Sequence, residues 1–217
     1  MDKPVDHYWM KRLNNLKAAL EKNWFEAYVA ESAEDARDIV EKEIINRINP
    51  KSVSFGGSMT FQATGLYGAL KKKKGLKVVD TLDKTVSPGE RMKRLKKALQ
   101  VDLFFTGTNA ITEIGQLVNL DRIGNRVAGI TFGPEHVVIC IGRNKVVADL
   151  EAAMERIKDY AAPVNAMRLD KKTPCVKTSH CAECNSPDRT CNTWTITEKS
   201  FPKGRTKVVL INEDLGL

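Results

Sequence analysis

Residues 101–147 read VDLFFTGTNAITEIGQLVNLDRIGNRVAGITFGPEHVVICIGRNKVV. Two short runs in this stretch, 101–105 and 136–141, are apolar and rich in β-branched or aromatic residues, which is typical of strands buried in a parallel sheet. The segment between them is dense in glycine and in polar side chains. Glycine permits tight turns and lets a ligand approach the backbone. The stretch therefore predicts buried strands that flank a polar ligand site.

Candidate ligand-binding residues in this segment are the glycines and the side chains that donate or accept hydrogen bonds: Gly107, Asn109, Thr112, Asn119, Asp121, Asn125 and Arg126. Residues 109–112 and 116–120 are expected to form a hairpin whose turn presents Glu113, the candidate catalytic base or nucleophile. Structural roles are the alternative: Glu113 as a solvated turn carboxylate, the two asparagines 109 and 125 as backbone caps, and Arg126 in an ion pair.

Three motifs in this stretch, TGTNAITE-x-G-x-LVN, D-x-x-GNRVAG-x-x-FGP and GRNKVV, resemble the LUD-domain (lactate-utilisation) family. The resemblance implies a fold like that of phosphosugar isomerases, ribose-5-phosphate isomerase and CoA transferases. In that group, glycine-rich turns hold a phosphate or cofactor, and some members use a carboxylate as base or nucleophile. The third motif adds Lys145 to the ligand-binding candidates. Two positions depart from what the resemblance leads us to expect: Ile114 stands where a polar residue is usual, and Arg122 where glycine is common. Arg122 could add positive charge to the pocket mouth or point into solvent, so the charge of the ligand stays open.

A second glycine-rich turn follows another predicted strand. Residues 51–55 read as a short strand that leads into Gly56, Gly57, Ser58 and Thr60, after which helical spacing resumes. Such a strand–turn–helix sequence can aim backbone N–H groups at an anion, although a plain turn with Ser58 as helix cap explains it equally well. Because ligands of open α/β sheets bind beyond the carboxyl ends of strands, we expect this turn and residues 109–126 to line one cleft.

The remaining pattern alternates helices and strands. Apolar spacing predicts a first helix along residues 9–24, packed on the main domain or on a second subunit, and a second one from a Ser32 cap to Pro50. Next come a strand at 77–79 and a helix capped by Ser87, with Met92, Leu95 and Leu99 pointing inward. The C-terminal part has a helix at 150–161 that Pro163 should stop, and strands at 193–197 and 206–211.

This order predicts an α/β fold, a three-layer domain built on a parallel sheet. We expect one LUD-like domain over 1–217, with an N-terminal helical extension (1–30), an α/β core (31–170), a Cys-rich loop (171–192) and C-terminal strands (193–217).

Composition narrows the class of protein. No apolar run is long enough to span a membrane, and the N-terminus lacks the apolar core of a signal peptide, so we expect a cytoplasmic location. The net charge of +8 favours a small anionic ligand. It does not favour nucleic acid, because the cationic run 91–97 reads as a solvated helix face without interleaved aromatic residues.

Four of the five cysteines lie within 17 residues: Cys175, Cys181, Cys184 and Cys191. The central C-x2-C pair can bring two thiolates to one ion, and the outer two complete four ligands for zinc or an iron–sulfur cluster. The spacing matches neither a zinc ribbon nor a ferredoxin run, so the metal stays open, and free thiols are the alternative. Cys140 lies inside an apolar strand and is expected to be a core residue.

Two functions follow from these observations. The resemblance implies a component of a cytoplasmic system that oxidises lactate to pyruvate beside iron–sulfur partner proteins, and a homodimer is compatible with it. The residues alone suggest instead a free-standing enzyme or binder for a phosphorylated or CoA-type ligand, with residues 56–60 on the phosphate and Glu113 as base.

Overall fold

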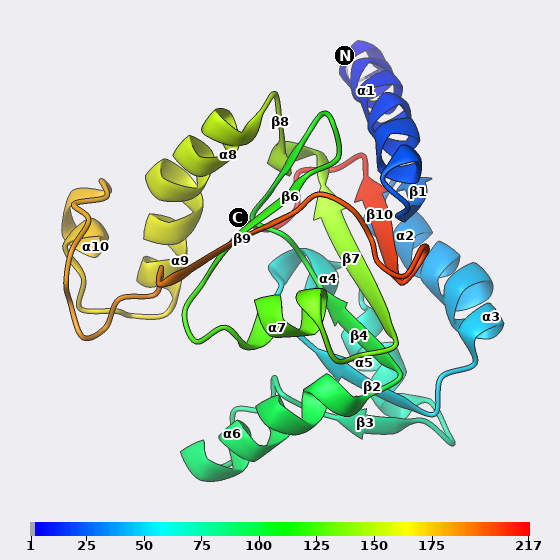
Figure 1. The fold of residues 1–217 in the computed structure, drawn as a ribbon, viewed down its shortest axis with the longest axis horizontal. Coiled ribbons are helices and arrows are strands. Elements are labelled where there is room, and N and C mark those ends of the chain that lie inside the picture. Colours follow the sequence, from blue (N-terminus) through cyan, green and yellow to red (C-terminus); the bar gives the residue numbers. More distant parts are fainter. Residues whose placement is uncertain (1–2) are drawn as a thin grey trace.

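The central sheet has six parallel strands in the order β1-β10-β7-β4-β2-β3 (Figure 1). The computed structural model describes residues 3–217, so Met1 and Asp2 of the predicted extension lie outside it. The strands are β1 (Glu26–Ala30), β2 (Ser52–Phe55), β3 (Lys77–Val79), β4 (Leu103–Thr106), β7 (His136–Gly142) and β10 (Thr206–Ile211). The predicted parallel sheet is confirmed, and β10 lies between β1 and β7, so the C-terminal strand completes the sheet's interior.

Both faces of the sheet are buried, which explains the apolar strands. In β7 the side chains of Val137, Ile139 and Ile141 face one core, and those of Val138 and Cys140 face the other. Alternate residues of a strand point to opposite faces, so an apolar run without interruption is needed where both faces are covered. Cys140 is fully buried as predicted, and burial raises the pKa of its thiol to about 12.

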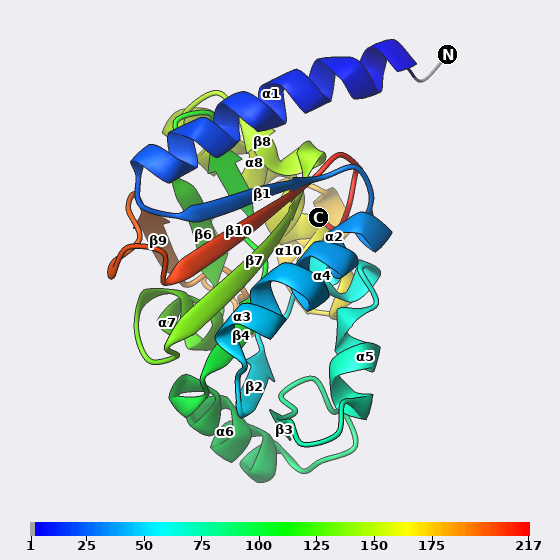
Figure 2. The same cartoon turned by 90° about the vertical axis from the view of Figure 1, so that its right-hand side faces the viewer.

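Helices form the outer layers (Figure 2). One face carries α1 (Lys3–Lys22), together with α7 (Asn125–Thr131) and η2 (Ala98–Gln100). In α1 the predicted apolar residues Leu13, Leu16 and Leu20 are buried, whereas the helix ends before Trp24, which is 40% exposed. The other face carries α2 (Ala33–Ile39), η1 (Val40–Ile45), α3 (Asn46–Ile48), α4 (Met59–Ala63) and α5 (Leu66–Lys72). The domain is therefore the three-layer α/β fold that the sequence predicts, and α1 packs on the domain itself.

A second, smaller sheet has the order β8-β5-β6-β9. Its strands are β8 (Val146–Val147), β5 (Ala110–Thr112), β6 (Leu117–Asp121) and β9 (Thr193–Thr197), and β5 with β6 forms the predicted antiparallel hairpin. One face joins the core beneath α1 through Ile111 and Leu117. The other packs on α8 (Leu150–Arg156) and η4 (Ile157–Ala161) through Val118 and Leu120. This sheet extends from the carboxyl end of β4 and holds the polar segment in place.

Helix ends agree with the sequence in two places and differ in a third. Ser32 and Ser87 accept hydrogen bonds from Asp35 N and Glu90 N, so both predicted caps are confirmed, the second on α6 (Pro88–Lys97). The expected stop at Pro163 is wrong, because α9 (Ala162–Arg168) continues directly from η4. Pro163 lies in the first turn of α9, after a π-helical segment whose wider turn accommodates a residue without an N–H.

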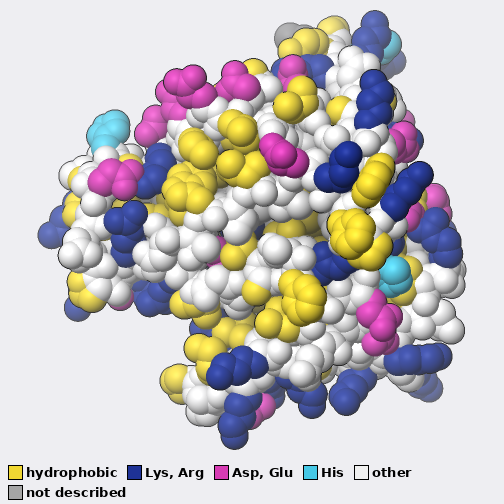
Figure 3. Space-filling view, in the orientation of Figure 1, with side chains coloured by type: hydrophobic (Ala, Val, Ile, Leu, Met, Phe, Trp, Pro, Cys, Tyr) yellow, Lys and Arg dark blue, Asp and Glu magenta, His cyan; other side chains and the backbone are white. Residues whose placement is uncertain are grey.

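The cationic face of α6 is solvated. Met92, expected to point inward, is 46% exposed, whereas Leu95 is buried. Lysine and arginine side chains gather along the rim of the molecule around α6 (Figure 3). Among residues 3–217, no helix has the length and apolar character of a membrane span.

Candidate functional site

The turn from β2 into α4 is held by its own hydrogen bonds. Gly56 N donates to Phe105 O at 2.7 Å, and the Ser58 hydroxyl caps α4 by accepting from Phe61 N at 3.1 Å. Gly57 is exposed and Thr60 is fully buried. Ser58 thus has the capping role that the sequence left as one of two alternatives.

The predicted second segment lies directly beside this turn. β2 and β4 are parallel neighbours, so their carboxyl ends meet at one edge of the sheet. A β-carbon added at Gly107, the residue after β4, would collide with the side chain of Ser58. The two segments thus lie side by side, as expected for a single site at this edge.

Arg126, on α7, ties this segment together. Its five N–H groups all have acceptors: Asp121 Oδ1 at 3.3 Å, Gly107 O at 3.1 Å, Asn109 Oδ1 at 2.7 Å, Leu120 O at 3.3 Å and Asn119 Oδ1. The residue is 8% exposed, and burial lowers the pKa of its guanidinium while Asp121 opposes that shift. Since each donor is engaged, Arg126 is a scaffold for the loop, and Asn109, Asn119 and Asp121 serve it as acceptors.

Two polar atoms beside this network are buried without a partner in the described part of the chain, residues 3–217. They are Asn119 Nδ2 and Asp121 Oδ2. A buried polar atom that lacks a hydrogen bond costs about 1–3 kcal/mol. The network therefore has one free hydrogen-bond donor and one free acceptor next to the loop.

Lys145 is the most unusual candidate residue. It ends η3 (Arg143–Lys145), after β7, and is 4% exposed. Its Nζ donates to Thr60 Oγ1 at 2.9 Å and to Thr108 O at 3.2 Å. Burial, together with Arg156 and Arg126, lowers the pKa of its ammonium to about 7. Within the described chain, 3–217, no carboxylate forms an ion pair with it.

Arg156, at the end of α8, is a site residue that sequence reasoning missed. Its Nη1 donates to Asn109 O at 2.8 Å and its Nε to Asn144 O at 3.0 Å. It is half-buried, burial lowers the pKa of its guanidinium, and its Cζ lies 5.6 Å from the centroid of the Tyr160 ring. Two of its five N–H groups thus have acceptors among residues 3–217, which leaves donors for a ligand. On sequence alone it reads as an ordinary polar residue of an amphipathic helix.

Three cations therefore hold three consecutive carbonyl groups. Arg126 binds Gly107 O, Lys145 binds Thr108 O and Arg156 binds Asn109 O. Asp121 pairs with Arg126, while Lys145 and Arg156 have no ion-pair partner among the described residues 3–217. Burying charge without compensation is costly, so this pair favours either a neutral amine or a bound anion. We call Lys145 and Arg156 the cationic pair.

The structure places other predicted residues away from this pair. Thr112 accepts from Gln116 N at 3.0 Å inside the hairpin, and Glu113 at its turn forms an ion pair with Arg12 of α1. Asn125 is half-buried at the start of α7. The hairpin thus carries Glu113 to α1, and its assignment as a base stays a prediction.

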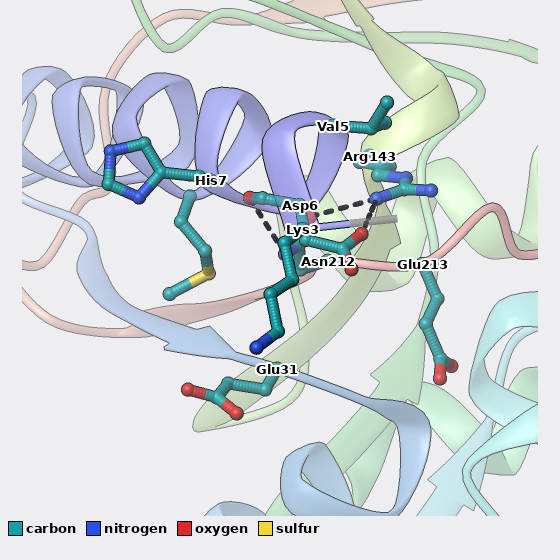
Figure 4. Close-up of a pocket in the computed structure, with 9 residues that line it drawn as sticks. Lys3, Val5, Asp6, His7, Glu31, Arg143, Asn212 and Glu213 are labelled. Atoms are coloured by element: carbon teal, nitrogen blue, oxygen red, sulfur yellow. Dashed lines mark hydrogen bonds and ion pairs between the residues drawn. The ribbon is translucent and has the colours of Figure 1, made fainter. Parts of the chain in front are cut away.

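A cleft of about 710 Å³ lies at the carboxyl ends of β1, β7 and β10 beneath the start of α1 (Figure 4). Arg143 crosses it, donating to Asp6 Oδ1 at 2.9 Å and Asn212 Oδ1 at 3.2 Å. Its lining, which the sequence did not predict, is Lys3, Val5, Asp6, His7, Met10, Glu31, Arg143, Asn212 and Glu213. Leu215 lies two residues after Glu213 of the cleft lining, and its carbonyl accepts a hydrogen bond from Thr60 Oγ1 at 2.9 Å. The same Thr60 oxygen accepts from Lys145 Nζ. The cleft and the cationic pair therefore share one edge of the sheet.

The Cys-rich loop is closed by polar contacts. Arg189 donates to Cys184 O at 2.7 Å and Cys191 O at 3.0 Å, and Lys158 contacts Cys181 Sγ at 3.9 Å. All four cysteines are free and half-buried. Over residues 3–217, no three histidine, cysteine or acidic side chains gather as metal ligands do. Arg189 thus binds the backbone carbonyls of Cys184 and Cys191, but the thiols are not preformed into a centre, so metal binding stays a prediction.

Comparison with known proteins agrees with this architecture. A family model described as the LUD domain matches residues 13–211 of the chain. A solved structure of a DUF162 family protein from Deinococcus radiodurans is similar in fold, with a TM-score of 0.50 and 13% identity, over 94% of this chain and 97% of that one. No curated protein matches. The chain therefore belongs to the LUD-domain family.

Proposed function

We propose that this protein binds a small carboxylate anion at the cationic pair and acts in lactate utilisation. The observation that carries the proposal is the pair itself: two cations at the carboxyl edge of the sheet, both partly or wholly buried, without an ion-pair partner in residues 3–217. An anion there would offset the cost of burying the charges and use the free donors of Arg156.

The wider role rests on the family. A LUD domain suggests a function related to lactate utilisation. We propose a cytoplasmic component of a system that oxidises lactate to pyruvate, working beside iron–sulfur partner proteins and, within it, as a homodimer. Lactate and pyruvate are both small carboxylates, and a guanidinium with free N–H groups binds a carboxylate through two parallel hydrogen bonds.

A binder for phosphorylated or CoA-type ligands is the alternative. Its support is the turn 56–60, where Ser58 caps a five-residue helix and Gly56 N donates to Phe105 O. These groups are engaged in the fold, so the alternative has less support than a carboxylate at the cationic pair.

The Cys-rich loop adds a separate proposal. Cys175, Cys181, Cys184 and Cys191 bind one zinc ion or iron–sulfur cluster when metal is supplied under reducing conditions, because four thiolates are ligands that both accept. When bound, zinc would fix the loop, whereas a cluster would add electron transfer.

Ligand-induced stabilisation tests the anion site. A ligand that prefers the native state raises the melting temperature, so lactate, pyruvate, phosphate, ribose 5-phosphate and CoA are compared at equal concentration. We expect lactate and pyruvate to stabilise the wild type and to lose this effect with Arg156→Met. Arg168→Met, at the exposed end of α9, is the matched control and should respond like the wild type. If only the phosphorylated ligands raise the melting temperature, the alternative function is favoured. If no ligand raises it, both the carboxylate site and the alternative are refuted.

A further inference from the structure

We infer that Lys145 is a nucleophile that forms an imine with a 2-oxo acid whose carboxylate is held by Arg156. The inference deepens the proposed function, on which it rests, by naming the substrate class as a carboxylate with a carbonyl group on the adjacent carbon. It goes beyond anion binding because it assigns covalent chemistry to one amine.

The hydrogen bonds of Lys145 leave one position on its nitrogen open. Nζ donates to Thr60 Oγ1 and Thr108 O, and Thr60 Oγ1 in turn donates to Leu215 O, so its oxygen acts as acceptor toward the lysine. A neutral amine satisfies both acceptors with its two N–H bonds and keeps its lone pair free. In the charged form the third N–H would lack an acceptor in the described chain, 3–217. The surroundings thus suit the neutral, nucleophilic form.

The electrostatic surroundings favour the same form. Burial, with the charges of Arg156 and Arg126, lowers the pKa of the Lys145 ammonium to about 7. A large fraction of the amine is therefore neutral at physiological pH. Lysine nucleophiles of other enzymes are activated in this way, by desolvation and neighbouring cations.

The two side chains bind neighbouring groups of one loop. Lys145 and Arg156 donate to the carbonyls of Thr108 and Asn109, which are consecutive residues. The inferred substrate has its carboxylate on Arg156 and its carbonyl carbon, one bond away, at Nζ. Gly216 lies over the amine, where a β-carbon would be 3.3 Å from Nζ, so glycine keeps a side chain out of that space.

The chemical step balances without a further reagent. The Nζ lone pair attacks the carbonyl carbon, and the carbonyl oxygen takes one proton from the nitrogen to give a carbinolamine. The C–O bond then breaks, and the hydroxyl leaves as water with the second proton of the nitrogen. The products are an imine and one water molecule, with no change in oxidation state.

Borohydride trapping followed by peptide mass spectrometry tests this step. Pyruvate with borohydride should add to Lys145 the mass of one pyruvate less one oxygen atom. Lactate, which has the carboxylate but no carbonyl, should add nothing. Lys207 is the internal comparison, because it is 3% exposed and burial lowers its pKa to about 8, but it contacts His136 and Gly204 and lies near Glu26.

The outcomes separate this inference from the proposed function. Labelling of Lys145 well above Lys207, lost in Arg156→Met but kept in Arg168→Met, supports the imine. If pyruvate and lactate stabilise the protein and Lys145 stays unlabelled, the imine is refuted while the anion site stands. If neither stabilises it and Lys145 is unlabelled, both fail. Equal labelling of Lys145 and Lys207 also refutes the inference, because it would reflect non-specific reactivity.

Discussion

Lys145 and Arg156, on different elements, bind the carbonyl groups of two adjacent residues: Nζ of Lys145 donates to Thr108 O at 3.2 Å, and Nη1 of Arg156 donates to Asn109 O at 2.8 Å. The loop after β4 therefore binds both side chains, neither of which has an ion-pair partner in residues 3–217. Its geometry in turn depends on Arg126, which binds Gly107 O and Asn109 Oδ1. Arg126 therefore stabilises the loop, and the loop carbonyls bind Lys145 and Arg156.

Arg126→Met should destabilise the protein strongly. The substitution leaves Asp121 and two amide oxygens without their donor, and breaking a buried pair costs about 3–5 kcal/mol. Urea unfolding of the variant measures this. Arg122→Gln, at an exposed position of the same loop, is the control and should stay within about 0.5 kcal/mol of the wild type. A loss below about 1 kcal/mol for Arg126→Met would contradict the scaffold role.

Lys145 should make the free energy of unfolding depend on pH above about 7. Its pKa is lowered in the folded state, so between pH 7 and its ordinary value the unfolded chain binds a proton that the folded chain does not. Stability therefore rises with pH in this window, by up to about 1.4 kcal/mol per pH unit. The measurement is the difference between wild type and Lys145→Met, which removes contributions from Lys207 and Cys140. An identical pH profile in both proteins would show that Lys145 titrates normally.

Anion affinity should fall as pH rises through about 7. A bound carboxylate favours the ammonium form of Lys145, so binding takes up a proton above that pH. The dissociation constant of lactate should then rise up to about tenfold per pH unit and level off below pH 7. Calorimetry in buffers of different ionisation enthalpy would detect the proton directly. Binding that is independent of pH would place the anion away from Lys145.

Glu113→Gln should change stability by no more than about 0.5 kcal/mol, because its ion pair with Arg12 lies at the surface. The same variant tests its assignment as a base. Loss of lactate-dependent growth with normal folding and normal lactate binding would support that role, and unchanged growth would contradict it.

The four cysteines of the loop should become unreactive when the protein is loaded with metal. Anaerobic purification, metal and sulfide analysis and a visible spectrum distinguish a coloured cluster from zinc. Cys140 is the internal control, since it is buried with a raised pKa and should react slowly in either state. Four thiols that titrate freely after exposure to both metals would refute the centre.

The sequence predicted what depends on local patterns. Residues close together in the sequence determine three features that were predicted correctly. They are the continuous apolar strands, the buried face of α1 with Leu13, Leu16 and Leu20, and the helix caps Ser32 and Ser87. The meeting of residues 56–60 with Gly107 followed from the parallel order of strands. Arg156 could not be predicted, because its role depends on how α8 packs against the small sheet. The predicted helix stop at Pro163 is wrong because the π-helical segment before it lets the helix continue through the proline.

Calorimetric titration of lactate and pyruvate into wild type, Arg156→Met and Arg168→Met, at a pH below about 7 where Lys145 is charged, tests the cationic pair most directly. We expect one site in the wild type and in Arg168→Met, and at least about tenfold weaker binding in Arg156→Met, since a charge-assisted hydrogen bond contributes about 1.5–3 kcal/mol. Equal affinities in all three proteins would contradict this expectation.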